Sequence, residues 1–271
     1  MLLDFFRLTY WANIASKLVI CMGINMKKRR KIYIIILLLM AAMLGLLVFL
    51  VLNRKINITH LWAKGYDVQG VDVSHYQGEI DWKVLQQSNI DFAFIKATEG
   101  SSYIDEKFKD NWQEAAQTEI RIGAYHFFSF DSPGREQAKL YIDTVGELSG
   151  KLVPVIDVEY YGDKQAKPPE REKVVESLQE MLLLLEQHYQ VKPIIYTTYK
   201  VYKKYIIDEF NGYPLWIRNV YYNPNIDIGK EWVFWQYSDT SIIKGYKGKE
   251  KYIDRNVFNG SLNELKKYIC K

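Results

Sequence analysis

The sequence predicts an α/β protein: an irregular barrel of about eight strands and five helices, preceded by one N-terminal transmembrane helix. Three observations lead to this prediction. A long uncharged apolar run lies near the N-terminus, strand-like and helix-like stretches alternate from Tyr66 onward, and polar residues recur where strands end. Alternation implies parallel strands joined by crossover helices, and eight strands favour a closed barrel. An open doubly wound sheet is the alternative, but no Gly-rich dinucleotide loop follows the first strand.

The apolar run Ile32–Leu52 contains no charged residue and is long enough to cross a bilayer of about 30 Å. It ends without the small-x-small site of a cleaved signal peptide, which favours an uncleaved anchor. The basic block Lys27–Lys31 precedes it, whereas only Arg54 and Lys55 follow closely. The positive-inside rule therefore predicts a single-pass membrane protein with a cytoplasmic N-terminus and an extracytoplasmic catalytic domain.

This topology divides the chain into four parts. They are a basic cytoplasmic segment at 1–31, a transmembrane helix at 32–52, a linker at 53–65 and a barrel domain at 66–271. A complete anchor signal begins at Met26 or Met22. We therefore interpret one of these as the true start of the protein and residues 1–25 as an extension upstream of it. Cys21 and Cys270 then lie on opposite sides of the membrane and cannot pair within one chain.

The barrel domain shows strands and helices in alternation. Predicted strands are Gln69–Val73, Phe92–Ala97, Arg121–Phe128, Leu152–Glu159, Pro193–Thr197, Pro214–Ile217, Val233–Tyr237 and a last one near Ile253. Predicted helices are Trp82–Gln87, Glu106–Gln117, Gly134–Val145, Glu170–Tyr189 and Tyr199–Ile207. The helix at Glu170–Tyr189 has the clearest periodicity.

Composition excludes several classes of function. The net charge of +4 is modest and lies largely near the N-terminus, and no Arg/Lys stripe interleaved with aromatics follows, so no nucleic acid is expected as a partner. The two cysteines and four histidines show no metal-type spacing, and we expect no cofactor. We interpret His75 and His126 as structural.

Asp157 and Glu159 are the most informative pair in the chain. They lie two residues apart at the end of an apolar run, so on a strand both side chains face the same way. Ile156 and Val158 then point into packing. Neighbouring carboxyls raise each other's pKa, and carboxyl pairs with separated pKa values are the equipment of glycoside hydrolysis. An ion-paired structural cluster, with Lys96 as partner, is the alternative interpretation.

Other predicted strands also end in polar residues, and in a parallel barrel such ends share one rim. These strand ends are Asp72-Val-Ser-His75, Lys96-Ala-Thr-Glu99, Tyr125-His126, Tyr196-Thr-Thr198 and Trp235-Gln-Tyr237. The repetition at one rim, more than any single residue, predicts a functional site there.

Taken together, these motifs resemble glycoside hydrolase family 25, the muramidases that cut peptidoglycan. The matching pieces are Gly70–Gln77, Phe94–Gly100, Gly123–Phe127, Pro154–Glu159, Leu215–Ile217, Trp235–Ser238 and Ile253–Asn256. They run in family order from about residue 67 to 269. The resemblance implies an irregular barrel and hydrolysis of the β-1,4 bond between N-acetylmuramic acid and N-acetylglucosamine.

The resemblance also assigns residues. Glu159 matches the catalytic acid, and Asp157, Asp72 and Asp254 match the family's other active-site acids. Matching positions around the site are Lys96, Glu99, Tyr125, Trp235 and Gln236, and we expect them to bind substrate together with Tyr196 and Trp216. This chain departs from the family at Arg218-Asn219, which affects the expected substrate contacts there. No metal is implied.

We expect Glu159 to donate the proton and Asp157 to stay ionised beside it. Asp157 would act on water or assist the sugar's own acetamido group, and the sequence leaves this open. The expected partners are peptidoglycan glycan strands and, through the helix, the membrane; envelope proteins are not identified. Self-directed wall remodelling is the expected role. The alternatives are a catalytically silent wall-binding module and a metal site built from Asp72, Asp157 and Asp254.

Overall fold

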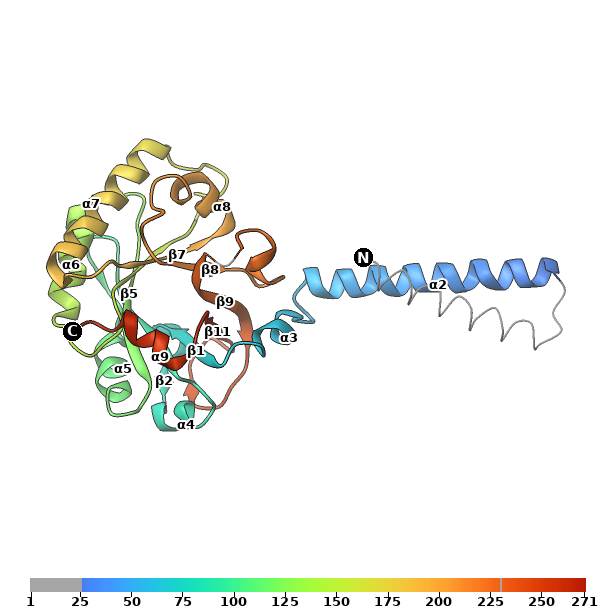
Figure 1. Ribbon diagram of the computed structural model, residues 1–271, viewed down its shortest axis with the longest axis horizontal. Helices are drawn as coiled ribbons and strands as arrows, with labels where there is room; N and C mark the ends of the chain where they lie inside the picture. Colours follow the sequence, from blue (N-terminus) through green and yellow to red (C-terminus); the bar gives the residue numbers. More distant parts are fainter. Residues whose placement is uncertain (1–25, 230) are drawn as a thin grey trace. The chain divides into compact units, whose positions relative to one another are not determined.

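The structure, a computed structural model, describes residues 26–229 and 231–271 (Figure 1). It divides at Ile56 into an N-terminal unit and a second unit, Asn57–Lys271. The predictions for residues 1–25, including the start-site extension and the position of Cys21, lie outside the described residues. Cys270 is a buried free cysteine.

The described part of the N-terminal unit contains one long helix, α2 (Met26–Leu52), of 27 residues. By length and composition it is able to cross a membrane, and its apolar side chains are not buried against protein. The predicted transmembrane run lies entirely within this helix. A membrane anchor and a signal sequence both have this character.

The second unit is a closed barrel of eight strands, as predicted. The strands are β1 (Val68–Val73), β3 (Phe92–Glu99), β5 (Arg121–Phe127), β6 (Val155–Val158), β7 (Ile194–Thr198), β8 (Leu215–Arg218), β9 (Trp232–Ser241) and β11 (Ile253–Phe258). Strand β1 pairs with β3 on one side and with β11 on the other, which closes the ring. Strands β1 to β9 in the ring run parallel, and β11 is antiparallel to both its neighbours.

Among the described residues, three short strands lie outside this ring. Strand β4 (Tyr103–Ile104) pairs antiparallel with the end of β3, and β2 (Glu79–Ile80) pairs with β10 (Tyr246–Lys247) as a separate ribbon. Both additions follow strand ends at the rim.

The five predicted helices all occur, one of them with the predicted bounds and the other four with shorter ends. They are α4 (Trp82–Gln86), α5 (Phe108–Ala115), α6 (Gly134–Val145), α7 (Arg171–Tyr189) and α8 (Tyr199–Val201), the last continued by the π-helical turn η2 (Tyr202–Ile206). Helices α3 (Thr59–Ala63) and α9 (Leu262–Leu265) and the 3₁₀ turns η1 (His75–Gln77), η3 (Pro224–Ile226) and η4 (Lys266–Tyr268) were not predicted. These pieces are too short to produce a helical period in the sequence.

Helix α3 belongs to the barrel unit, which therefore begins within the stretch 53–65 predicted as a linker. Thr59 is fully buried and donates a hydrogen bond of 2.6 Å from its hydroxyl to the Tyr237 carbonyl on β9. Gln69 donates a bond of 3.1 Å from its side-chain amide to the Ala63 carbonyl. Only residues 53–56 separate α2 from this unit.

Aromatic rings fill the barrel interior beneath the rim. Phe94 packs on Trp216 with ring centroids 4.7 Å apart, and Phe92 packs on Phe234 at 5.1 Å. A Cβ atom at Gly70 would lie 2.4 Å from the Phe92 ring, so only glycine fits there. Because the interior is packed, a ligand can enter only at the mouth of the barrel.

Candidate active site

A cleft of about 290 Å³ opens at the carboxyl ends of the strands. Its lining residues are Asp72, Val73, Ser74, Tyr76, Gln77, Lys96, Tyr125, Phe127, Asp157, Glu159, Tyr196, Gln236, Asp239, Glu250, Tyr252 and Asp254. A second hollow of about 390 Å³ shares Glu159 and Asp254 with it and extends to Arg218. The cleft therefore lies at the rim where the predicted strands end, and the four predicted acids, Asp254 from the family resemblance among them, line it.

Strand β6 places Asp157 and Glu159 in this cleft, on the same side of the chain. Ile156 and Val158, which alternate with them, are fully buried. Asp157 is itself only 7% exposed, and its Oδ1 atom has no hydrogen-bond partner among the described residues. A buried acceptor without a donor is unfavourable, so this oxygen is poised to meet a donor or a positive charge on a ligand.

Burial raises the pKa of both carboxyls. For Asp157 the charge of Glu159 adds to burial, and the pKa lies well above its usual value although Lys96 opposes the shift. For Glu159 burial also dominates, while the guanidinium of Arg218 lowers the pKa. Burial therefore opposes the expected ionisation of Asp157, because Asp157 is buried as deeply as its neighbour.

Asp72 and Asp254 complete the acid cluster from the strands that close the barrel. Burial raises the pKa of Asp72, and burial together with Asp72 raises that of Asp254. Gln236 donates from Nε2 to Asp72 Oδ2 at 3.0 Å and to Asp254 Oδ2 at 3.2 Å. Asn256 donates a further bond of 2.7 Å to Asp72 Oδ2. These amides hold the two carboxyls in place.

Three of the predicted substrate-binding residues, Tyr196, Trp216 and Gln236, lie around these acids. Tyr196 lines the cleft, and its hydroxyl donates to Gln236 Oε1 at 2.9 Å. Trp216, only 2% exposed, donates from Nε1 to Asn256 Oδ1 at 2.9 Å. Trp216 therefore orients the residue that orients Asp72, and it does not line the cleft.

Trp235 lies on the opposite face of β9 from Gln236. It is fully buried, donates from Nε1 to the Asn219 carbonyl at 2.7 Å and packs against Tyr66 and Tyr237. The structure does not bring Trp235 to the cleft, because neighbouring residues of a strand face opposite ways.

Lys96 and Tyr125, both predicted to bind substrate, line the cleft. Lys96 Nζ lies 2.6 Å from Glu99 Oε2, and the Glu99 side chain is 43% exposed outside the cleft lining. Burial and the nearby acids raise the pKa of Tyr125 well above its usual value. Its hydroxyl therefore stays protonated and serves as a hydrogen-bond donor at the mouth.

Arg218 and Asp239 are functional candidates that the sequence did not identify as such. They form an ion pair between β8 and β9 at the edge of the cleft. In the sequence, Arg218 stands out only as a departure from the family. Its position at a strand end, two residues after the inward-facing Trp216, was the available signal.

Within residues 26–229 and 231–271, no three His, Cys, Asp or Glu side chains are placed to hold a metal ion together. The alternative of a metal site at Asp72, Asp157 and Asp254 is thus not formed. His126 is fully buried between Thr98 and Gln137, and burial lowers its pKa to about 4. This neutral imidazole is structural, as expected.

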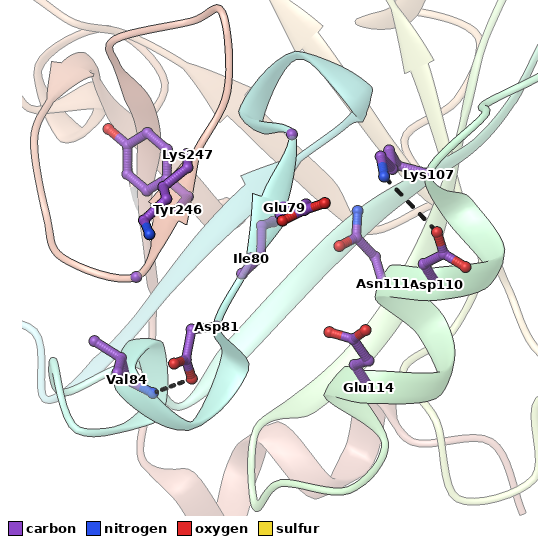
Figure 2. A pocket seen from close by; sticks show the side chains of 12 residues that line it. Glu79, Ile80, Asp81, Val84, Lys107, Asp110, Asn111, Glu114, Tyr246 and Lys247 are labelled. Carbon is purple, nitrogen blue, oxygen red and sulfur yellow. Dashed lines mark hydrogen bonds and ion pairs between the residues drawn. The ribbon is translucent and has the colours of Figure 1, made fainter.

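A separate groove of about 500 Å³ lies between the β2–β10 ribbon and helices α4 and α5 (Figure 2). It contains the Lys107–Asp110 ion pair, and Asp81 in it caps α4. Glu79 and Glu114 add carboxylates on its two sides. None of the predicted site residues lines this groove, so its carboxylates are suitable control positions for mutagenesis.

Residues 71–246 of this chain match the family model for glycosyl hydrolases family 25. The chain is 35% identical to the uncharacterised protein YegX of Escherichia coli K12, over 75% of this chain and 74% of that protein. It is 33% identical to lysozyme M1 of Streptomyces globisporus, over 73% and 70%. A solved family 25 glycosyl hydrolase from Bacillus anthracis superposes with a TM-score of 0.71 and 48% identity, covering 75% of this chain and 94% of that one.

Proposed function

This chain belongs to glycosyl hydrolases family 25. We propose that it is a muramidase. The bond cleaved is the β-1,4 linkage between N-acetylmuramic acid and N-acetylglucosamine in peptidoglycan. One observation carries the proposal: the carboxyls of Asp72, Asp157, Glu159 and Asp254 converge in one buried cleft at the barrel mouth. A name among the relatives, lysozyme, agrees with this substrate class.

Glu159 is the general acid. It must hold its proton near neutral pH and transfer it to the oxygen that leaves the anomeric carbon. Burial, together with the charge of Asp72, supports this role by raising the Glu159 pKa. Once the proton is transferred, the Glu159 carboxylate is stabilised by Arg218, whose charge favours the ionised form.

Asp157 acts on the developing positive charge of the sugar ring. In the free cleft the Asp157 carboxyl favours its proton, because burial and Glu159 oppose ionisation and raise the pKa. A bound sugar that becomes positively charged at the anomeric carbon shifts this balance toward the carboxylate. The acetamido N–H of the sugar is a suitable donor for the unpaired Oδ1, which favours participation of the acetamido group.

Asp72 and Asp254 shape the field of the cleft and bind sugar hydroxyls. Gln236 fixes both carboxyls and Asn256 fixes Asp72, which leaves their remaining lone pairs for the substrate. The neutral hydroxyl of Tyr125 on β5 and the ammonium of Lys96 on β3 supply donors to the same cleft.

The helix α2 anchors the enzyme in the cell membrane. Residues 1–31 face the cytoplasm and the barrel lies outside, as the basic block before the apolar run favours. An enzyme held in this way acts on the wall of its own cell, which supports a role in wall remodelling.

Mass spectrometry of products from defined peptidoglycan tests the bond and the enzyme class together. We expect new reducing ends at N-acetylmuramic acid, and their loss in Glu159→Gln by about 10³-fold, as removal of a general acid predicts. Glu114→Gln, in the separate groove, is the matched control and should retain full activity. Reducing ends at N-acetylglucosamine, or full activity of Glu159→Gln, would contradict the proposal. Tight sedimentation with walls but no products would indicate a silent binding module.

A further inference from the structure

The barrel unit presents large apolar side chains around helix α3. Leu61 is 72% exposed and Trp62 is 39% exposed, although the same helix buries Thr59 and Ala63 against the barrel. An amphipathic turn normally turns its apolar residues inward. Here the outward residues are the larger ones, so this helix has a second apolar face that the described residues of its unit leave exposed.

Two neighbouring segments extend this face. Ser241 Oγ lies 3.5 Å from His60 Nε2, which brings α3 to the end of β9, and the next residue, Ile242, is 62% exposed. Asn223 donates to the Tyr66 hydroxyl at 3.2 Å, which brings turn η3 toward the chain that follows α3. Ile226 in this turn is 69% exposed. Four large side chains thus emerge from three segments tied to one another.

The short segment between α2 and α3 and the residues beside the exposed apolar side chains indicate which partner this face can bind. Six residues, 53–58, separate the end of α2 from the start of α3, and a chain of that length reaches at most about 20 Å. Lys64 and Lys244, both exposed, flank the apolar residues on α3 and after β9. Trp near lysine beside an apolar helix is typical of the membrane–water interface, where anionic lipids attract the lysines.

We propose that this face, the membrane-facing patch of Leu61, Trp62, Ile226, Ile242, Lys64 and Lys244, docks on the surface of an anionic phospholipid bilayer. The inference rests on the proposed anchoring by α2, which holds α3 close to the lipid. Strand β9 carries Gln236 and Asp239 in the cleft and ends at this patch. Docking therefore fixes the cleft mouth at a set height, and the glycan strands nearest the membrane become the substrate.

The test uses residues 57–271 without α2. This unit folds on its own, because it closes its own sheet around its own hydrophobic core. Cosedimentation with vesicles of phosphatidylglycerol and phosphatidylcholine measures binding, and vesicles of phosphatidylcholine alone measure the share due to charge. Brominated lipid reports contact by quenching Trp62 fluorescence. The test variant is Leu61→Ser/Trp62→Ser. The control is Leu183→Ser/Ile207→Ser, which replaces two other exposed apolar residues, 44% and 38% exposed, away from the patch.

We expect the barrel and its control variant to bind anionic vesicles alike, and the test variant to bind at least about tenfold more weakly. Hydrolysis of soluble glycan fragments should be the same in all three proteins. Equal binding by the test variant, or no binding of the wild-type barrel at millimolar lipid, would overturn the proposal. A barrel dimer that the test variant dissociates, without vesicle binding, would assign the patch to a second copy instead. Failure of the muramidase proposal would appear separately, as a lack of products in the glycan assay.

Discussion

Asp72 and Asp254 stand opposite each other in the register of β1 and β11 and share the side-chain amide of Gln236. The antiparallel last strand is what creates this pair, because it returns Asp254 to the rim beside the first strand. Beneath them a chain of hydrogen bonds runs from Trp216 through Asn256 to Asp72. Asp72 is therefore positioned from below by two buried side chains, Asn256 and Trp216, that do not line the cleft.

Asn256 is predicted to be a positioning residue. Asn256→Leu removes its bond to Asp72 and leaves the Trp216 N–H unpaired, so the free energy of unfolding should fall by about 3 kcal/mol. The Asp72 pKa should rise, because the bond from Asn256 is the largest effect that lowers it. Chemical denaturation and the pH profile of kcat/KM check the two effects.

Asn259→Ala is the control for Asn256. This residue donates one bond of 3.0 Å to the Trp232 carbonyl and is half-buried, outside the cleft. Its removal should lower stability by about 1 kcal/mol and leave the pH profile in place. An unchanged pH profile in Asn256→Leu would mean that Asn256 is merely structural.

Arg218 and Asp239 should shift the pH profile in opposite directions. Arg218 lowers the pKa of Glu159, and Asp239 raises it. Arg218→Met should therefore move the alkaline limb of kcat/KM to higher pH, and Asp239→Asn should move it to lower pH. Arg135→Met, which breaks an exposed ion pair with Glu180, is the control and should move neither limb. Shifts of the same sign in both cleft variants would refute this account of the field around Glu159.

The barrel and the order of its strands along the chain could be predicted from the sequence, because both depend on local pattern. Asp72, Asp157 and Glu159 stand at predicted strand ends, whereas Asp254 was expected only from the family resemblance. Strand alternation also distinguishes Gln236 from Trp235: if Gln236 faces the cleft, its neighbour Trp235 must face away. Trp216 does face inward, yet it lies one level below Arg218 and is covered. The Arg218–Asp239 pair depends on the register between β8 and β9, which no local pattern specifies.

Helix α6 should be intolerant of a side chain at its first residue. A Cβ at Gly134 would lie 1.8 Å from the Ser177 carbonyl oxygen of α7, and backbone cannot yield as a flexible side chain can. Gly134→Ala should lower the free energy of unfolding by about 3 kcal/mol. In Gly212→Ala the nearest atom is the mobile end of Lys192, so thermal unfolding should change little. Equal stability of the two variants would contradict the tight contact between α6 and α7.

The buried Asp157 carboxyl should make the barrel less stable as pH rises. Its folded-state pKa is raised by burial and by Glu159, so above about pH 4 the folded state binds more protons than the unfolded state. That stabilisation is present in acid and is lost as pH rises toward the folded-state pKa. The free energy lost is about 1.4 kcal/mol for every tenfold difference in proton affinity between the folded and unfolded states. Asp157→Asn removes the titration. The variant should melt at a higher temperature than the wild type at pH 8, but not at pH 4, although it loses activity. Asp110→Asn, an exposed carboxyl in the separate groove, is the control, and its melting temperature should differ from the wild type by the same amount at both pH values. If the melting temperatures of Asp157→Asn and the wild type changed with pH in the same way, the prediction would be wrong. Asp157 would then ionise in the folded barrel as easily as in the unfolded chain, despite the three other acids around it.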